Sequence, residues 1–220
     1  MKLFSFCIYG NNKKYTQGLV ENLEIINRDF PEFYIWIYCG NNVPAEYIFK
    51  YRSFKNTKLI LVNKADGSLM VDRFFSIDSE NVELCFVRDA DSRINDRDKY
   101  CIKTFMSSNK LFHIIRDHPY HGMRIMGGMW GSYKLWFKIE ELYLKWKLDK
   151  VSLTHYQNDQ EFLRDIIYPL VKNVALIQTN YDHFGDEDLV KIDFPADGTN
   201  FVGNVLNYRE NGENYFEFSL

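Results

Sequence analysis

The chain has 220 residues, of which 46% are hydrophobic and 17% aromatic, enough for one domain with a substantial core and too many for a disordered chain. Its formal net charge is −3 and its basic residues form no cluster, which argues against binding through nucleic-acid phosphates. The apolar run at the N-terminus is too short to span a membrane and the four cysteines form no CxxC pair, so we expect a protein of the reducing cytoplasm with neither a disulfide nor a zinc site.

Strands and helices alternate in the first half of the sequence. Strongly apolar runs predict four β-strands, at residues 2–9, 34–39, 58–62 and 82–87. Helical patterns lie between them, at residues 13–30, from Pro44 onward and at residues 69–78. This alternation predicts right-handed crossovers and a Rossmann-like α/β fold, with a mainly parallel central sheet flanked by helices. Ligands of such sheets bind beyond the carboxyl ends of the strands.

The second half of the sequence is less regular. It predicts a strand at 111–115, a loop rich in glycine and methionine at 118–131, an aromatic-rich helix at 132–147, a further helix at 158–170, a strand at 175–178 and a mostly irregular segment from Tyr181. We expect one domain over residues 1–220. Its parts are a nucleotide-binding half at about 1–110, a half for the donor sugar and the acceptor at about 111–203, and a C-terminal tail at 204–220.

Two aspartates directly follow the fourth predicted strand. Side chains at i and i+2 of an extended chain point to the same side, so the carboxylates of Asp89 and Asp91 can face one point. Carboxylate oxygens suit Mg²⁺ or Mn²⁺, and such an ion can neutralise the charge that grows on a leaving nucleoside diphosphate. The pair could also be a solvated turn. Its position after four apolar strands, beside Arg88 and Arg93, favours the metal site.

A glycine-rich segment follows in the second half. Gly127 and Gly128 permit a close approach of the backbone to a ligand, and Trp130 next to them offers an apolar platform for a sugar. The same residues are compatible with a simple turn and a tryptophan in the core, and the sequence supports both interpretations. His118 and His121 have no further metal-ligand spacing around them, so we interpret them as polar pocket wall.

The helix predicted at 158–170 begins with four polar residues. Asn158 followed by Glu161 has the spacing of a capping box. Asp159 falls in the first turn, where a carboxylate can take the proton from an attacking acceptor hydroxyl. The two roles are compatible, because a capped helix is a rigid place for a general base.

Two further residues are candidates for the site. His183, in the C-terminal segment, can complete the ligands of the metal, and the alternative is an ordinary surface loop. Arg73, in the helix before the fourth strand, can reach the donor phosphate, although an arginine on an amphipathic helix is more often a solvated cation.

Taken in order, these segments resemble nucleotide-diphospho-sugar glycosyltransferases of the GT-A fold. The resemblance is strongest to the small glycan-building domains of bacterial capsule loci and of large DNA viruses such as chlorella viruses. It covers about residues 1–203 and rests on Ile8-Tyr9-Gly10, VRDADSR at 87–93, RDHPYH at 116–121, GGMWG at 127–131 and NDQE at 158–161. The DxD pair alone is generic, whereas the RDxDSR and DHPYH…GGMWG segments together are more specific.

The resemblance implies an enzyme that moves a sugar from a nucleotide-diphosphate donor, with a UDP-sugar favoured, onto a carbohydrate acceptor. It implies that Asp89 and Asp91 hold Mn²⁺ or Mg²⁺ against the donor. His183 is similar to a metal-binding histidine of the family, although Gly185 and Lys191 depart from the His-x-x-Gly-x-x-Lys spacing. A viral member would act in the host cytoplasm. The other implied donor contacts are Ile8, Tyr9 and Gly10 with the nucleotide, and Gly127, Gly128, Trp130 and Gln160 with the sugar.

Two other functions fit parts of the sequence. A metal-dependent phosphohydrolase could use the two aspartates and the two histidines. The haloacid-dehalogenase pattern, however, places DxDx[TV] after the first strand, whereas here the pair follows the fourth strand and Arg93 replaces Thr or Val. A non-catalytic nucleotide-sugar or glycan-binding module on the same fold is disfavoured, because both carboxylates and Asp159 are present.

Overall fold

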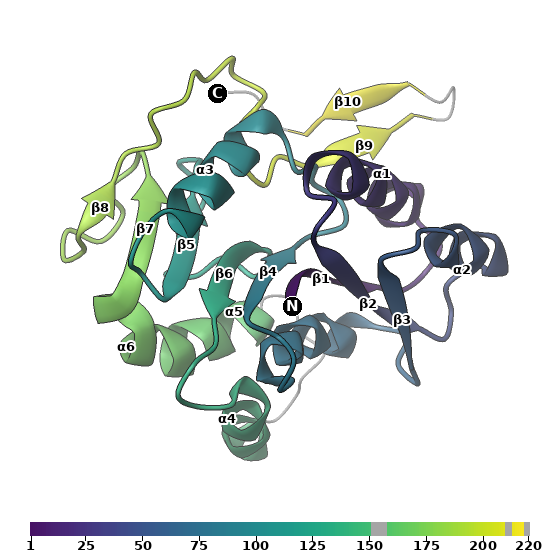
Figure 1. Cartoon of the computed structure of the whole chain (residues 1–220), viewed down its shortest axis with the longest axis horizontal. Helices are drawn as coiled ribbons and strands as arrows, with labels where there is room; N and C mark the ends of the chain where they lie inside the picture. The colour runs from purple at the N-terminus through teal and green to yellow at the C-terminus, as the bar shows by residue number, and fades with distance from the viewer. Residues whose placement is uncertain (151–157, 210–212, 218–220) are drawn as a thin grey trace.

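An eight-stranded sheet forms the centre of the protein (Figure 1). The computed structural model describes residues 1–150, 158–209 and 213–217. The strand order is β3-β2-β1-β4-β6-β5-β7-β8, and each neighbouring pair is parallel except the two that contain β6. The α/β fold with a mainly parallel central sheet is therefore confirmed. The strands are β1 (Lys2–Ile8), β2 (Tyr34–Gly40), β3 (Thr57–Val62), β4 (Leu84–Arg88), β5 (Phe112–Arg116), β6 (Met129–Tyr133), β7 (Ala175–Thr179) and β8 (Leu189–Val190).

Helices cover both faces of the sheet. One face packs against α1, α2 and α3, and the other packs against η1, α4, α5 and α6. Within the described ranges, no helix is both long enough and apolar enough to cross a membrane. The helices are α1 (Lys13–Asp29), α2 (Ala45–Arg52), the 3₁₀ helix η1 (Gly67–Asp78), α3 (Asp96–Met106), α4 (Ile139–Trp146), η2 (Lys147–Asp149), α5 (Asn158–Phe162), the π-helical turn η3 (Leu163–Ile167), α6 (Tyr168–Val171) and η4 (Lys172–Val174).

The central strands supply both hydrophobic cores, because successive side chains of a strand point to opposite faces. In β4, Phe86 points to the core under α1 and α3, and its neighbours Cys85 and Val87 point to the core under η1 and α4. In β1, the ring of Phe4 lies 5.6 Å from that of Phe86. Strands buried on both faces read as continuous apolar runs, which is why these two were predicted from the sequence.

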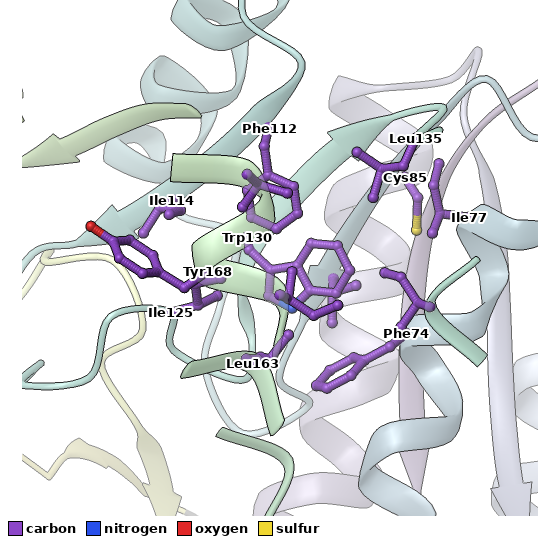
Figure 2. Packing of buried hydrophobic residues seen from close by; sticks show 14 of the residues in the cluster. Phe74, Ile77, Cys85, Phe112, Ile114, Ile125, Trp130, Leu135, Leu163 and Tyr168 are labelled. Carbon is purple, nitrogen blue, oxygen red and sulfur yellow. The ribbon is translucent and has the colours of Figure 1, made fainter. Parts of the chain in front are cut away.

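β6 differs from the prediction of a loop followed by a helix. Met129–Tyr133 forms an antiparallel strand between β4 and β5, and α4 begins only at Ile139. Trp130 is fully buried there, with its ring stacked on Phe112 at 5.3 Å and edge-on to Phe74 at 5.4 Å (Figure 2). Gly131 suggested a loop, but a Cβ at that position would lie 2.4 Å from the ring of Phe86. The glycine therefore makes room for a neighbouring aromatic ring within the sheet.

The C-terminal segment, predicted to be mostly irregular, forms a second small sheet. β9 (Leu206–Tyr208) and β10 (Asn214–Phe216) pair antiparallel. The hydroxyl of Tyr208 donates a hydrogen bond to Glu21 of α1 and accepts one from Arg93 at 2.7 Å. In Figure 1 this yellow hairpin lies beside α1, so the end of the described chain returns to its first helix.

His113 in β5 is completely buried and uncharged. Its Nε2 lies 2.7 Å from Oε1 of Gln178, and its ring stacks on Phe105 at 4.8 Å. Burial lowers the pKa of His113 from 6.5 to about 3, so between these values the unfolded chain binds a proton that the folded chain does not. The free energy of unfolding therefore falls as the pH drops below 6.5. The contribution of His113 to this fall is about 2 kcal/mol at pH 5.

We expect a His113→Gln variant to lose most of this contribution, because an amide can still face Gln178 but does not titrate. Urea unfolding at pH 7 and pH 5 measures the effect in both proteins. Other groups titrate in the same interval, so the quantity to compare is the change in unfolding free energy between the two pH values. Equal changes in the parent and the variant would contradict a neutral, buried His113.

Candidate active site

Several of the predicted site residues meet at one edge of the sheet. β1 and β4 are parallel neighbours with Ser5 opposite Val87, so the residues that follow both strands lie at the same edge. Tyr9 and Gly10 follow β1, and Asp89 follows β4. β6 runs in the opposite direction, with Met129 opposite Arg88, so the glycines before β6 reach this edge too.

The end of β1 is tied to the two strands beside it. Gly10 has a φ of +74°, and its backbone N–H donates to Oδ1 of Asn42 at 2.8 Å. The amide of Asn42 in turn donates to the carbonyl of Ala65, after β3, at 3.0 Å. Tyr9 is half-buried, whereas the side chain of Ile8 lies in the core, so a ligand could contact Ile8 only through its main chain. The sequence analysis missed Asn42, although the pair Asn41-Asn42, one residue after the strand predicted at 34–39, was a usable signal.

Arg73 lies at the centre of the site. It is only 3% exposed, so its interpretation as a solvated cation is wrong. One guanidinium nitrogen, Nη1, donates to Asp89, and the other, Nη2, lies 3.4 Å from Oδ2 of Asp159. The main-chain carbonyl of Arg73 accepts a hydrogen bond from Ser5 in β1 at 2.7 Å, which fixes η1 under the strand ends. The structure thus brings together three residues that are distant in the sequence.

Gly127 and Gly128 pack directly against the two carboxylates of this cluster. A Cβ on Gly128 would lie 2.1 Å from Oδ2 of Asp89, and a Cβ on Gly127 would lie 2.6 Å from Oδ2 of Asp159. No other residue fits without moving these carboxylates. The close packing of the glycine pair against both carboxylates favours its interpretation as part of the candidate site over that of a simple turn. Trp130 is not part of the site: it is fully buried, so the prediction that it stacks on a sugar is wrong.

Asp91 lies beside Asp89 with little compensating positive charge. Burial and the nearby charge of Asp89 raise the pKa of Asp91 to about 6, and Nζ of Lys14 lies 3.8 Å from its carboxylate. The side chain of Asp89 is 42% exposed and that of Asp91 15% exposed. Mg²⁺ and similar ions are commonly held by one or two carboxylates together with phosphate oxygens. The neighbouring carboxylates of Asp89 and Asp91, one of them partly exposed to solvent, therefore fit such an ion.

His183 is not placed as a third metal ligand. Its Nδ1 lies 3.2 Å from the carbonyl oxygen of Tyr181 and its Nε2 3.0 Å from that of Pro119. A metal needs a free lone pair on a ring nitrogen, whereas carbonyl oxygens attract a protonated one. Across the described ranges, no group of three or more His, Cys, Asp and Glu side chains could hold a metal ion. His183 would have to release one of these carbonyls before it could bind a metal.

His118 and His121 do not form a metal site in this structure either. Nδ1 of His118 accepts a hydrogen bond from the backbone of Tyr120, and Nδ1 of His121 accepts one from the backbone of Asp117. Each neutral ring therefore carries its proton on Nε2, which makes that nitrogen a donor. Burial lowers the pKa of His121 to about 3, so it stays neutral.

Asp159 is buried beside Arg73, and its Oδ1 accepts the backbone N–H of Gln160 at 2.9 Å. Burial raises its pKa, the charge of Arg73 opposes this rise, and the charge of Asp89 adds to it. The capping box predicted from Asn158 to Glu161 is not made, because Oδ1 of Asn158 has no partner among the described residues. Residues 151–157, which precede this turn, lie outside them. Oε1 of Gln160 is also buried without a described partner.

Two cavities lie away from this cluster. One of about 360 Å³ is lined by Lys134, Trp136 and Glu141 among others, and one of about 390 Å³ is lined by Met1 and Tyr34 among others. Met1 precedes β1 and Tyr34 begins β2, so the second cavity lies at the amino ends of the strands. No predicted site residue lines either cavity. The candidate site is therefore identified from the carboxyl ends of the strands and not from the volume of a cavity.

Similar solved structures identify the fold of the chain. No protein-family model and no curated protein matches the sequence. The structure of S. aureus TarS residues 1–349 matches with a TM-score of 0.55 at 15% identity, over 82% of this chain and 59% of that one. The LgtC galactosyltransferase, solved with donor and acceptor sugar analogues, gives 0.55 at 12% identity, over 81% and 73%. A glycosyltransferase involved in glycosylation of the major capsid of PBCV-1 gives 0.51 at 13% identity, over 80% and 79%. The chain has a GT-A fold.

The GT-A fold was expected from the order of the sequence segments, and it is confirmed. At such low identity the likeness concerns the fold alone, so function has to be argued from the site. In this GT-A chain the cluster offers two chemically different carboxylate positions. Asp89 and Asp91 form a partly exposed pair suited to a cation, and Asp159 is a separate, buried carboxylate on the other side of Arg73.

Proposed function

We propose that the chain is a metal-dependent glycosyltransferase that moves a sugar from a nucleotide-diphosphate donor, preferably a UDP-sugar, onto a carbohydrate acceptor. The observation that carries this proposal is the cluster in which Arg73 pairs with both Asp89 and Asp159 at the carboxyl ends of the strands. The GT-A fold supports it, as does a structure of TarS solved with UDP, which matches with a TM-score of 0.53 at 14% identity.

Asp89 and Asp91 would hold Mn²⁺ or Mg²⁺ together with oxygens of the donor diphosphate. When bound, such an ion neutralises the negative charge of the leaving diphosphate. The nucleotide would lie along the end of β1, where Tyr9 is half-buried and Gly10 is fixed through Asn42.

Asp159 would act as the base that takes the proton from the acceptor hydroxyl. Burial favours its protonated form, which makes the carboxylate a better proton acceptor than one in water. The charge of Arg73 favours the ionised form of Asp159 and fixes Oδ2, while Oδ1 accepts the backbone N–H of Gln160 at 2.9 Å, so both oxygens have a fixed orientation. Gln160, Gly127 and Gly128 would border the donor sugar beside it.

The rival assignments receive less support from the site. A phosphohydrolase that used His118 and His121 as metal ligands would need free lone pairs on Nε2, whereas both rings accept hydrogen bonds at Nδ1 and so carry the proton on Nε2. A binding module without turnover would not need a base in the position of Asp159.

The test of the proposed function is donor cleavage with and without metal. UDP-glucose, UDP-galactose and UDP-N-acetylglucosamine are incubated with the protein and a panel of simple glycosides, and released UDP is measured. We expect release in Mn²⁺ and its loss in excess EDTA, because the leaving diphosphate is then not neutralised. Asp91→Asn should lower the rate by about 10²-fold or more.

Asp96→Asn is the matched control for this substitution. Asp96 is also an aspartate near the site in sequence, but its side chain is 79% exposed and forms an ion pair with Lys99. It should retain the parent rate. Full donor cleavage in EDTA would rule out the metal-dependent mechanism.

A further inference from the structure

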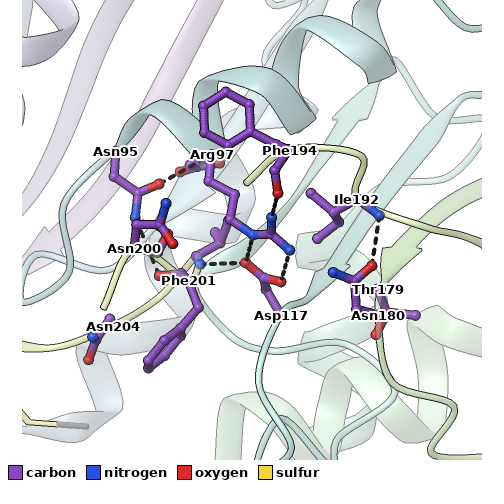
Figure 3. A network of polar contacts seen from close by, with 12 residues as sticks. Asn95, Arg97, Asp117, Thr179, Asn180, Ile192, Phe194, Asn200, Phe201 and Asn204 are labelled. Carbon is purple, nitrogen blue, oxygen red and sulfur yellow. Dashed lines mark hydrogen bonds and ion pairs between the residues drawn. The ribbon is translucent and has the colours of Figure 1, made fainter. Parts of the chain in front are cut away.

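Residues 192–206, called the strap here, run across the edge of the sheet that carries the aspartates. Figure 3 shows the polar contacts that attach the first part of this segment. The backbone N–H of Ile192 donates to Asn180, which follows β7, at 3.0 Å. The carbonyl of Phe194 accepts from Arg97 of α3. The first residues of the strap are thus bonded both to the segment after β7 and to α3.

A buried ion pair anchors the middle of the strap. Arg97 and Asp117 are each 1% exposed, and Nε and Nη2 of Arg97 donate to the two carboxylate oxygens of Asp117 at 2.5 and 2.8 Å. Asp117 also accepts the backbone N–H of Val202 at 2.9 Å. The amide of Asn95 donates to the carbonyl of Asn200 at 2.7 Å, while Oδ1 of Asn95 caps α3.

Apolar packing holds the strap against the sheet. Ile192 and Val202 are almost fully buried against Ile115 and Met129. At Gly203, which has a φ of +86°, a Cβ would lie 2.5 Å from the sulfur of Met129. The strap therefore has one tightly specified path over the ends of β5 and β6.

The end of the strap bonds to the main chain of the DxD loop. Val205 forms an antiparallel bridge with Ser92, and the backbone N–H of Leu206 donates to the carbonyl oxygen of Asp91 at 2.9 Å. On the other side, the amide of Asn22 in α1 donates to the carbonyl of Ser92 at 2.7 Å. Gly18 of the same helix packs so closely that a Cβ would lie 2.3 Å from the carbonyl oxygen of Ala90. The loop is clamped between α1 and the strap.

We propose that the strap positions Asp91 for cation binding, through the bond from Leu206 to the main chain of Asp91. This inference rests on the proposed function, because it assigns the clamp to the metal-binding aspartates. A carboxylate binds an ion well only when its backbone is held, since ordering a mobile loop on binding reduces affinity. Leu206, Asn95 and Asp117 are positioning residues in this assignment and touch no substrate.

The test is a substitution that removes the backbone N–H of Leu206 and leaves the other contacts of the strap in place. Leu206 is the first residue of β9, a position that tolerates proline, and Leu206→Pro deletes the donor to Asp91. Leu206→Ala is the matched control, because it shortens the side chain but keeps the N–H. With UDP present, the dissociation constant for Mn²⁺, measured by electron paramagnetic resonance of the free ion, should rise about 5–10-fold in Leu206→Pro. It should stay within about 2-fold of the parent in Leu206→Ala.

A second variant covers the case in which proline unfolds the protein. Asn95→Asp retains an oxygen that caps α3 but loses the amide donor to the strap, so α3 should persist while the strap loosens. Melting temperatures identify the folded variants. We expect the same direction of change in Mn²⁺ affinity as for Leu206→Pro.

Hydrogen exchange separates this inference from the proposed function. Amides of residues 89–94 should exchange faster in Leu206→Pro and Asn95→Asp than in the parent without any metal present. Faster exchange in a protein that binds no Mn²⁺ would support the clamp and refute the metal-dependent function. Unchanged exchange and unchanged Mn²⁺ affinity in folded variants would overturn the strap assignment.

Discussion

Replacing Asp159 by asparagine should lower the rate of sugar transfer by about 10²–10⁴-fold, the usual effect of removing a general base. Asparagine has nearly the same size and can still accept a hydrogen bond from Arg73, but it cannot take a proton. Donor affinity should change little, because the proposed cation and nucleotide contacts come from Asp89, Asp91 and the end of β1. The expected loss is therefore in kcat rather than in the donor KM.

Two controls distinguish this chemical role from a structural one. Asp165→Asn makes the same substitution in the next turn, where the side chain is partly exposed and pairs with Arg164. It should leave transfer unchanged. Asn158→Ala tests helix capping, and with no cap bond made among the described residues it should also have little effect on transfer. Transfer at the parent rate by Asp159→Asn would end the assignment of the base and direct attention to substrate-assisted or retaining chemistry.

Arg73→Met should be the most destabilising substitution in the site. It leaves Asp159 buried without its cation, and removal of one partner of a buried ion pair costs about 3–5 kcal/mol of unfolding free energy. Arg73→Lys should be intermediate, because an ammonium group cannot reach two carboxylates with the fixed fork of a guanidinium. Urea unfolding near pH 7 measures both effects.

The double variant Arg73→Met, Asp159→Asn tests the cause of this loss. If an unpaired buried carboxylate is responsible, neutralising it should restore a large part of the stability that Arg73→Met removes. The parent, both single variants and the double variant form a complete cycle for this interaction. A loss below about 1 kcal/mol in Arg73→Met would show that Arg73 is not a structural counter-ion of Asp159.

The first half of the fold could be predicted because its signals are local. The strands around Phe4 and Phe86 are apolar on both faces, and a strand that ends on Asp89-Ala90-Asp91 places its carboxylates at a known edge of the sheet. Asp159 was placed at the start of a predicted helix, and it lies in the cluster beside Arg73. Its role as the base stays a prediction, because the same helix start also suggested a capping box.

The remaining features depend on contacts between distant segments. Arg73 had the pattern of a surface arginine, and only the meeting of Asp89 and Asp159 around it explains its burial. Trp130 and Gly131 suggested a loop, because the sequence does not show that Phe86 needs the space over the glycine. The strap escaped prediction for the same reason: its order comes from Asp117 and the DxD loop rather than from its own sequence pattern.

The position of β6 also determines the order in which the sheet can be completed. β6 pairs with β4 on one side and β5 on the other, so a growing chain that has not reached Tyr133 has no strand to join them. The four strands β3-β2-β1-β4 can associate early, whereas the contact of Gly128 with Asp89 arises only when β6 inserts. Pairings between distant segments form slowly, because a long loop must close before any contact compensates for the lost chain entropy. We therefore expect the contacts of the candidate site to form after β3, β2, β1 and β4 have paired.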